Sequence, residues 1–196
     1  HWLRVDQFHP ALRVRFVPHS SPTVHLGDAR SDGEAKPVPV FIRSEGGEAF
    51  APDAVATIKD VERGKTVLFF VEIDMGTEPF DAPGKNRTTI VQKIRKYQRY
   101  FQAERYRDYE SVWDCSFRGF RVLFVTNAKT RSAFLSQHLV GFCPREFIWI
   151  TNEEQLLKHG VGGSIWARGG QQDRPSESIL GSRAGGVHPA TAAVTS

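Results

Sequence analysis

The chain has 196 residues, of which 40% are hydrophobic and 24% charged, with a formal net charge of +4 and a pI near 9.2. These values predict one soluble globular domain, and no apolar run approaches the roughly 20 residues that a membrane helix needs. The mild basic excess suits a polyanionic partner such as a nucleic acid.

The first part of the chain predicts a helix, a loop and a strand. Residues 2–16 carry apolar residues at a mixed spacing that favours an amphipathic helix, although Pro10 falls inside it. Residues 18–37 are rich in Ser, Gly, Asp and Pro, which is typical of a loop. Residues 38–44 alternate and are β-branched, so they predict a strand that ends at a glycine turn.

Two further strands are predicted at 50–59 and 66–73, and with 38–44 they form a meander. The last of them is a continuous apolar run, typical of a strand buried on both faces. A loop at 75–87 precedes a helix that Thr88 caps and that reaches to about Tyr109. The remaining predicted elements are strands at 118–125 and 146–150 and helices at 128–139 and 153–159.

This order of elements predicts an α/β domain with a mixed central sheet flanked by helices on both faces. We expect the domain to span residues 1–167. Residues 168–196 are dominated by Gly, Ser, Ala and Arg, and we predict that they form a flexible tail that cannot bury enough apolar surface to fold.

Three acids are predicted to meet at the ends of neighbouring strands. Glu72 interrupts an apolar strand, and strand alternation puts Asp74 on the same face. If Asp53 begins the preceding strand, antiparallel pairing brings it opposite the end that carries Glu72 and Asp74. Converging carboxylates need a cation, and Mg²⁺ or Mn²⁺ is the cation expected at Asp53, Glu72 and Asp74. Acids that are solvated or paired with Lys or Arg are the alternative.

The helix that follows is strongly basic, with eight Lys and Arg between residues 85 and 107 against the single acid Glu104. Lys93 lies one turn before Tyr97 on the same helix face, and we expect its amine beside the acids, close to a catalytic water. A solvated basic face is the alternative to a DNA-binding face. The residues predicted to contact DNA are Lys85, Arg87, Arg95, Lys96, Tyr97 and Arg99.

Pro52-Asp53 followed by Glu72-x-Asp74 resembles the PD-(D/E)XK nuclease superfamily. More closely, the segments PDAV, FFVEIDMGTE and KIRKYQRY are similar to the replication-relaxation family of bacterial plasmid and mobile-element proteins, over about residues 1–150. The resemblance implies a restriction-endonuclease-like αβββαβ core with Asp53 and Glu72 as metal ligands. Asp74 stands where that superfamily has a lysine. Some of its branches carry a Gln-x-x-x-Tyr pattern on the next helix, which here reads Lys93 to Tyr97.

Together these features predict a Mg²⁺-dependent DNA endonuclease or nickase-like domain of a plasmid replication or mobilisation protein. Its catalytic residues would be Asp53, Glu72, Asp74 and Lys93. A non-catalytic DNA-binding module of the same fold and a protein–protein scaffold are the alternatives.

The remaining expectations concern the cellular setting. Because the first residue is His1, we expect a longer natural protein, and an upstream DNA-binding domain and a homodimer both stay open. Cys115 and Cys143 lack the spacing of a zinc site, so we expect reduced thiols in a cytoplasmic protein.

Overall fold

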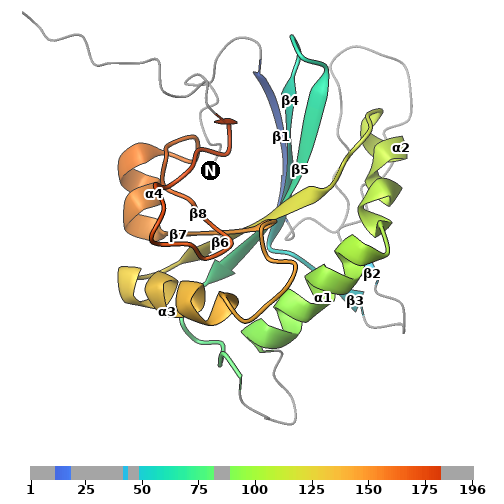
Figure 1. The fold of residues 1–196 in the computed structure, drawn as a ribbon. Coiled ribbons are helices and arrows are strands. Elements are labelled where there is room, and N and C mark those ends of the chain that lie inside the picture. The colour runs from blue at the N-terminus through green and yellow to red at the C-terminus, as the bar shows by residue number, and fades with distance from the viewer. Residues whose placement is uncertain (1–11, 19–41, 44–48, 82–88, 182–196) are drawn as a thin grey trace, which may run out of the picture.

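The computed structural model describes residues 12–18, 42–43, 49–81 and 89–181 (Figure 1). In this part of the chain, six strands form one mixed sheet in the order β1-β4-β5-β6-β7-β8. β5, β6 and β7 are parallel to one another, and the other neighbouring pairs are antiparallel. Two short strands, β2 (Ile42–Arg43) and β3 (Ala49–Phe50), pair separately. The strands of the main sheet are β1 (Leu12–Pro18), β4 (Ala54–Asp60), β5 (Lys65–Asp74), β6 (Phe120–Thr126), β7 (Ile148–Asn152) and β8 (Ala167–Arg168).

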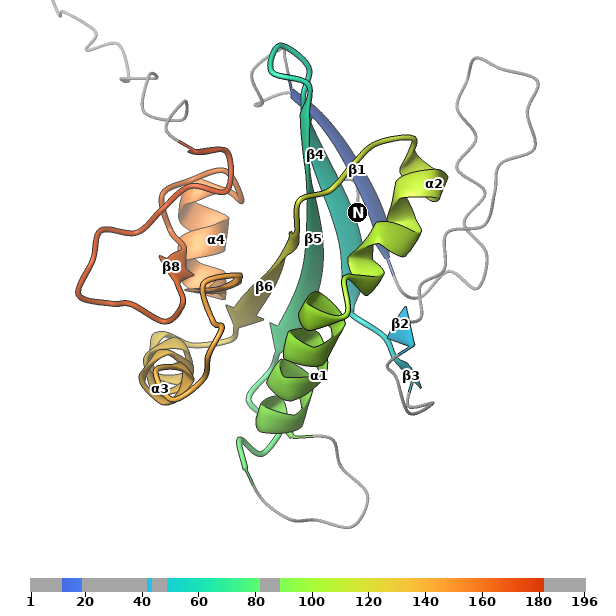
Figure 2. The same cartoon turned by 45° about the vertical axis from the view of Figure 1, so that its right-hand side comes forward.

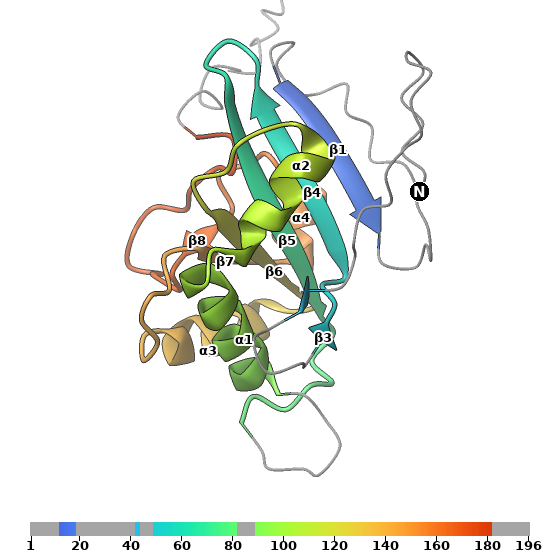
Figure 3. The ribbon, with the colours of Figure 1, turned by 90° about the vertical axis from the view of Figure 1, so that its right-hand side faces the viewer.

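Helices cover both faces of this sheet. One face carries α1 (Ile90–Gln102), the 3₁₀ helix η2 (Arg105–Tyr109), α2 (Glu110–Trp113) and α3 (Lys129–Leu139). The other face packs against α4 (Glu153–His159) and the segment around Trp166. Figure 2 shows α1 lying along β5, and Figure 3 shows α1 and α2 in front of the sheet with α4 behind it. None of the described helices is long and apolar enough to cross a membrane.

β5 separates the two hydrophobic cores. Leu68 and Phe70 face α1, whereas Phe69 between them faces the core on the other side, and all three are at most 1% exposed. The Phe70 ring meets four aromatic rings at centroid distances of 5.0 to 5.8 Å: those of Tyr97, Tyr100, Tyr109 and Phe120. This packing fixes β5 against α1 and therefore fixes the acids at the end of β5.

The predicted α/β class and the helix-flanked mixed sheet are confirmed, but the first strands differ from the prediction. The helix predicted at 2–16 is wrong for Leu12–Phe16, which belong to β1 and pair with β4. The reason is the strict alternation of Arg13 and Arg15 with Val14 and Phe16, which has the period of a strand. Residues 1–11 lie outside the described residues.

The predicted meander also needs correction. In the described part of the predicted strand 38–44, β2 pairs with β3 instead of with β4, and β1 occupies the place beside β4. Sequence neighbours pair by default, and here a more distant alternating segment takes that edge of the sheet. The hairpin of β4 and β5 was predicted correctly to within a few residues.

α1 begins and ends at residues other than those predicted. Thr89, not Thr88, is the N-cap: its hydroxyl accepts from the Gln92 N–H at 3.2 Å, and the Gln92 side chain accepts from the Thr89 N–H at 3.1 Å. The helix ends at Gln102, well before Tyr109, because Glu104 has a left-handed backbone with φ of 52° and starts the separate helix η2.

Residues 167–181 pack onto the sheet as part of the domain. β8 pairs with β7, Trp166 and Glu177 exchange two backbone hydrogen bonds, and Ile179 is only 6% exposed. The prediction of a flexible tail is therefore wrong for residues 168–181, which belong to the folded domain. A single buried isoleucine in a polar segment produces no periodic pattern, which is why the sequence did not predict it. Residues 182–196 lie outside the described residues.

Candidate functional site

The carboxyl end of β5 buries two acids on the face that α1 covers. Glu72 is 2% exposed and Asp74 is 3% exposed, whereas Ile73 between them is 53% exposed. Strand alternation puts both acids on the same face as Phe70, as the sequence predicted. Buried carboxylates at this depth require hydrogen-bond donors or cations.

Two side chains of α1 hold Glu72. The Lys93 ammonium nitrogen lies 3.0 Å from Oε2 of Glu72, and the Tyr97 hydroxyl donates to Oε1 at 2.6 Å. Lys93 and Tyr97 are four residues apart, so they project from one face of the helix. The structure therefore confirms that Lys93 lies beside Glu72.

Burial and neighbouring charges shift the pKa values of this pair. Burial raises the pKa of Glu72 and Asp53 adds to the rise, while Lys93 and Tyr97 oppose it. Burial alone would lower the pKa of Lys93, but Glu72 and Glu78 outweigh it and the net shift is upward. Lys93 therefore stays a charged donor at neutral pH.

A second cation, Arg131 of α3, holds Asp74. Its Nε lies 2.7 Å from Oδ2 of Asp74, while the Gly76 N–H donates to Oδ1 at 2.9 Å. Arg131 Nη2 also donates to the Glu78 carbonyl at 2.7 Å, and Lys93 lies 2.9 Å from Oε1 of Glu78. The segment after β5 is thus tied to α1 by one cation and to α3 by the other.

Asp53 lies beside Glu72 at the start of β4. Ala54 pairs with Val71, so continuing this register by one residue puts Asp53 opposite Glu72 on the same face. Oδ2 of Asp53 accepts the Ile73 N–H at 2.7 Å, and the side chain is exposed. We call Asp53, Glu72, Asp74 and Glu78 with Lys93 and Arg131 the carboxylate cluster.

The three acids predicted as metal ligands have different partners in the structure. Asp53 and Glu72 face each other, but both oxygens of Asp74 are engaged, by Arg131 and by the Gly76 amide. Across the described ranges, no three or more His, Cys, Asp or Glu side chains are grouped so that they could hold a metal ion. The ion pair with Arg131 balances the charge of Asp74, as the ion pair with Lys93 balances that of Glu72, so metal binding by these acids stays a prediction.

The residues predicted to contact DNA have different surroundings. Arg95 and Arg99 are exposed on α1, and Lys96 is half-buried. Tyr97 is fully buried and its hydroxyl is bonded to Glu72, so the prediction that it contacts DNA is wrong. Lys85 and Arg87 lie outside the described residues.

Sequence reasoning missed Glu78 and Arg131. Glu78 lies in a segment that reads only as a proline- and glycine-rich loop, and Arg131 belongs to a helix assigned no role. The one available signal was that Asp74, if buried, requires a cationic partner. Nothing in the sequence identifies which of the 26 Lys and Arg residues is that partner.

Most of this cluster falls within residues 5–114, the region that matches the model of the Replication-relaxation family. The match spans more than half of the 196-residue chain. The chain belongs to the replication-relaxation family. In this replication-relaxation protein the matched region contains β4, β5 and α1, with Asp53, Glu72 and Lys93, whereas α3 and Arg131 lie beyond it. Searches of curated proteins and of solved structures return no match.

Proposed function

We propose that this domain is the metal-dependent DNA endonuclease domain of a plasmid replication or mobilisation protein, with a restriction-endonuclease-like core. The observation that carries the proposal is the meeting of Asp53, Glu72 and Lys93 from three different elements, with the ammonium 3.0 Å from Glu72. Membership of the replication-relaxation family supports the setting of plasmid or mobile-element DNA.

The charges of the carboxylate cluster fit a divalent cation. Within the part of the chain that the structure describes, its four carboxylates face two cations, Lys93 and Arg131. Oε2 of Glu78 is buried and has no hydrogen-bond partner among the described residues. Asp53 and Glu72 are the residues that would hold the ion, since Mg²⁺ binds through one or two carboxylates together with waters and a substrate phosphate. When bound, such an ion supplies Lewis acidity towards the phosphodiester.

Lys93 and Tyr97 would support this chemistry in different ways. The raised pKa of Lys93 keeps it an ammonium, so it would orient a water and balance negative charge on the phosphate, and would not act as a base. Tyr97 positions Glu72 through its 2.6 Å hydrogen bond. The exposed Arg95 and Arg99 of α1, with Lys96 beside them, are available for contacts to the DNA backbone.

A non-catalytic DNA-binding module is the second candidate, and one observation favours it. Each oxygen of Glu72 already accepts a hydrogen bond, one from Lys93 and one from Tyr97. A carboxylate satisfied in this way can be retained for stability alone.

Cleavage of supercoiled plasmid DNA in Mg²⁺ or Mn²⁺, compared with EDTA, separates the two candidates. For the endonuclease we expect nicked or linear product only with metal, and a loss of at least about 100-fold in rate for Asp53→Asn and for Glu72→Gln. Glu154→Gln, which neutralises an exposed acid of α4 on the opposite face of the sheet, is the matched control and should cleave like the parent.

Binding measured in the same samples completes the comparison. A domain that shifts DNA in EDTA and never cleaves it with either metal would be the non-catalytic module. Equal cleavage by the parent and Glu72→Gln would contradict the proposed site. Circular dichroism of each variant checks that the fold is retained.

A further inference from the structure

A cavity of about 330 Å³ opens at the start of β5, the end opposite to the carboxylate cluster. Its walls come from the starts of β5 and β6, the end of α1 and the segment before β7. Thr66 on its wall is six residues before Glu72 on an extended strand, so the cavity lies about 20 Å from the carboxylate cluster. It is therefore a separate site.

Three arginines, Arg118, Arg121 and Arg168, line this cavity against a single acid, Glu146. Arg118 has no ion-pair partner in the described part of the chain. Arg168 reaches only Glu177, at 3.9 Å, and both of these side chains are about half exposed. The cations of the carboxylate cluster, in contrast, are paired with acids at 2.7 to 3.0 Å. Positive charge at this cavity is thus left largely uncompensated.

Arg121 is the most constrained of the three. Its guanidinium lies 4.2 Å from the centroid of the Trp149 ring, and its polar contact is a long hydrogen bond of 3.5 Å to the Ile179 carbonyl. Trp149 pairs with Leu123 on one side and with Arg168 on the other, so Arg121 and Arg168 lie on the same face of the sheet. Burial and the charge of Arg168 lower the pKa of Arg121, and Glu177 opposes this shift in part. An anion between the two guanidinium groups would relieve this repulsion.

Apolar groups form the rest of the cavity wall. Val67, Phe101 and Pro144 line it, and Phe101 is only partly buried. Gly119 has φ of +153°, and a Cβ added there would lie 3.3 Å from the Phe101 ring. The glycine therefore leaves room beside Phe101. The volume lies within the range of small-molecule sites, and the lining combines an apolar wall with a few convergent charges.

We propose that this cavity binds a nucleotide through its phosphate group, either a free nucleotide or the terminal nucleotide of a DNA strand. Guanidinium groups match phosphate geometry with paired N–H donors, and three arginines against Glu146 and the exposed Glu177 leave net positive charge for a phosphate. Val67, on the same face of the sheet as Arg121, and Phe101 with Pro144, on the α1 side of the cavity, are the apolar surfaces available to the base. This inference does not depend on the nuclease proposal, since it uses none of the residues of the carboxylate cluster.

Calorimetric titration at fixed ionic strength tests the proposal with a defined set of probes. These are deoxyadenosine 5′-monophosphate, deoxyadenosine, inorganic phosphate, and a short DNA strand with either a 5′-phosphate or a 5′-hydroxyl end. We expect the monophosphate to bind at least about tenfold more tightly than the nucleoside or inorganic phosphate. Arg118→Gln and Arg168→Gln, both at exposed side chains, should each weaken binding about tenfold.

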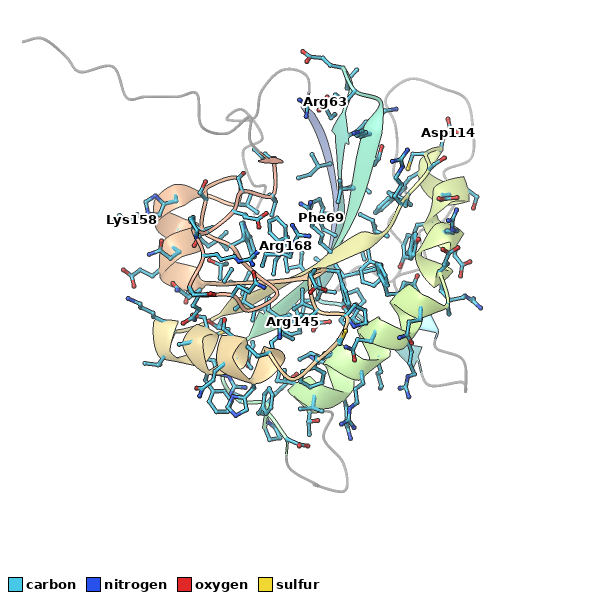
Figure 4. All side chains as sticks on the ribbon, viewed as in Figure 1. Arg63, Phe69, Asp114, Arg145, Lys158 and Arg168 are labelled. Carbon is cyan, nitrogen blue, oxygen red and sulfur yellow. The ribbon has the colours of Figure 1, made fainter. Side chains whose placement is uncertain are left out.

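Arg63→Gln is the matched control. It removes the same charge at the tip of the β4–β5 hairpin, which Figure 4 shows well apart from Arg168. Tighter binding of the 5′-phosphorylated strand than of the free nucleotide would assign the site to strand ends, and the reverse order would assign it to free nucleotides. Equal affinity for nucleotide and nucleoside, equal affinity for inorganic phosphate, no binding at all, or an equal loss in Arg63→Gln would each overturn the proposal.

Discussion

Lys93 bridges two carboxylates, lying 3.0 Å from Glu72 and 2.9 Å from Glu78, with only 18% of its side chain exposed. The attraction within such a buried group is largely offset by the cost of removing the charges from water. The ion pairs of Lys93 therefore affect stability mainly when one partner is removed, because the remaining charge is then buried without compensation.

Replacing Lys93 with methionine should consequently destabilise the domain by about 3–5 kcal/mol, since Glu72 would remain buried. Urea denaturation at neutral pH measures this change. The double variant Lys93→Met with Glu72→Gln should recover most of the loss, and Arg99→Met, at an exposed position of the same helix, should change stability by less than about 0.5 kcal/mol. If the Lys93→Met domain were as stable as the parent, the ion pair with Lys93 would not be what compensates the buried charge of Glu72.

The site was predictable only where local periodicity determines position. Glu72 and Asp74 share a face because strands alternate, and Lys93 and Tyr97 share a face because helices repeat every 3.6 residues. Which face of α1 meets β5 was also predictable, because the apolar stripe had to be buried. Arg131 reaches Asp74 from α3, and that approach depends on the packing of two elements far apart in sequence, which no local pattern encodes.

At the scale of elements, α1 depends on its first turn. Thr89 and Gln92 satisfy each other's backbone N–H groups in a capping box, and Thr89 is 2% exposed. Thr89→Ala should therefore cost about 1 kcal/mol of unfolding free energy. Chemical denaturation measures it, with Thr130→Ala, outside α1, as the comparison. A change below about 0.3 kcal/mol would mean that the box contributes little.

The packing of η2 on α1 introduces a dependence on alkaline pH. Burial raises the pKa of Tyr100, with Tyr109 and Asp108 adding to the shift and Arg105 opposing it, and its hydroxyl donates to the Arg105 carbonyl at 2.9 Å. As the pH rises above 10, the unfolded chain loses this proton while the folded chain keeps it. The folded state then binds more protons, so stability falls with rising pH.

Tyr100→Phe should remove the part of this alkaline loss of stability that comes from Tyr100. We expect the variant to lose about 1 kcal/mol near neutral pH with the hydrogen bond, and to show a shallower decline in stability between about pH 9 and pH 11. Urea denaturation across this range gives the slope. An unchanged slope would mean that Tyr100 does not titrate differently in the folded and unfolded states.

Element types were predictable where the chain carries a continuous apolar run, as in β5 and β6, or a clear helix cap, as at Asn152 before α4. β1 was mistaken for a helix because its alternation is short and directly follows a stretch with mixed spacing. The end of α1 was missed because apolar residues continue at helical spacing into η2, while a single left-handed residue, Glu104, breaks the helix. One backbone angle of this kind leaves no compositional trace.

For the whole molecule, the segment after β8 closes the second core. Ile179, Trp166 and Ile165 pack with Phe69 and Trp149 on the face opposite α1. A chain ending at residue 167 would expose this core, so we expect its melting temperature to fall by about 5–10 °C. A chain ending at residue 181 keeps every one of these contacts and serves as the control. Equal melting temperatures for the two would show that residues 168–181 add nothing to stability.

α1 also sets the distance between the carboxylate cluster and the arginine-lined cavity. It presents Lys93 to the carboxylate cluster and Phe101 to the arginine-lined cavity, eight residues further along. At 1.5 Å per residue, the backbone positions of these two residues lie about 12 Å apart along the helix axis, and their side chains span the rest of the roughly 20 Å between the two sites. Occupants of the two places would be kept at a spacing that the length of one helix determines, and inserting one turn would change that spacing by about 5.4 Å.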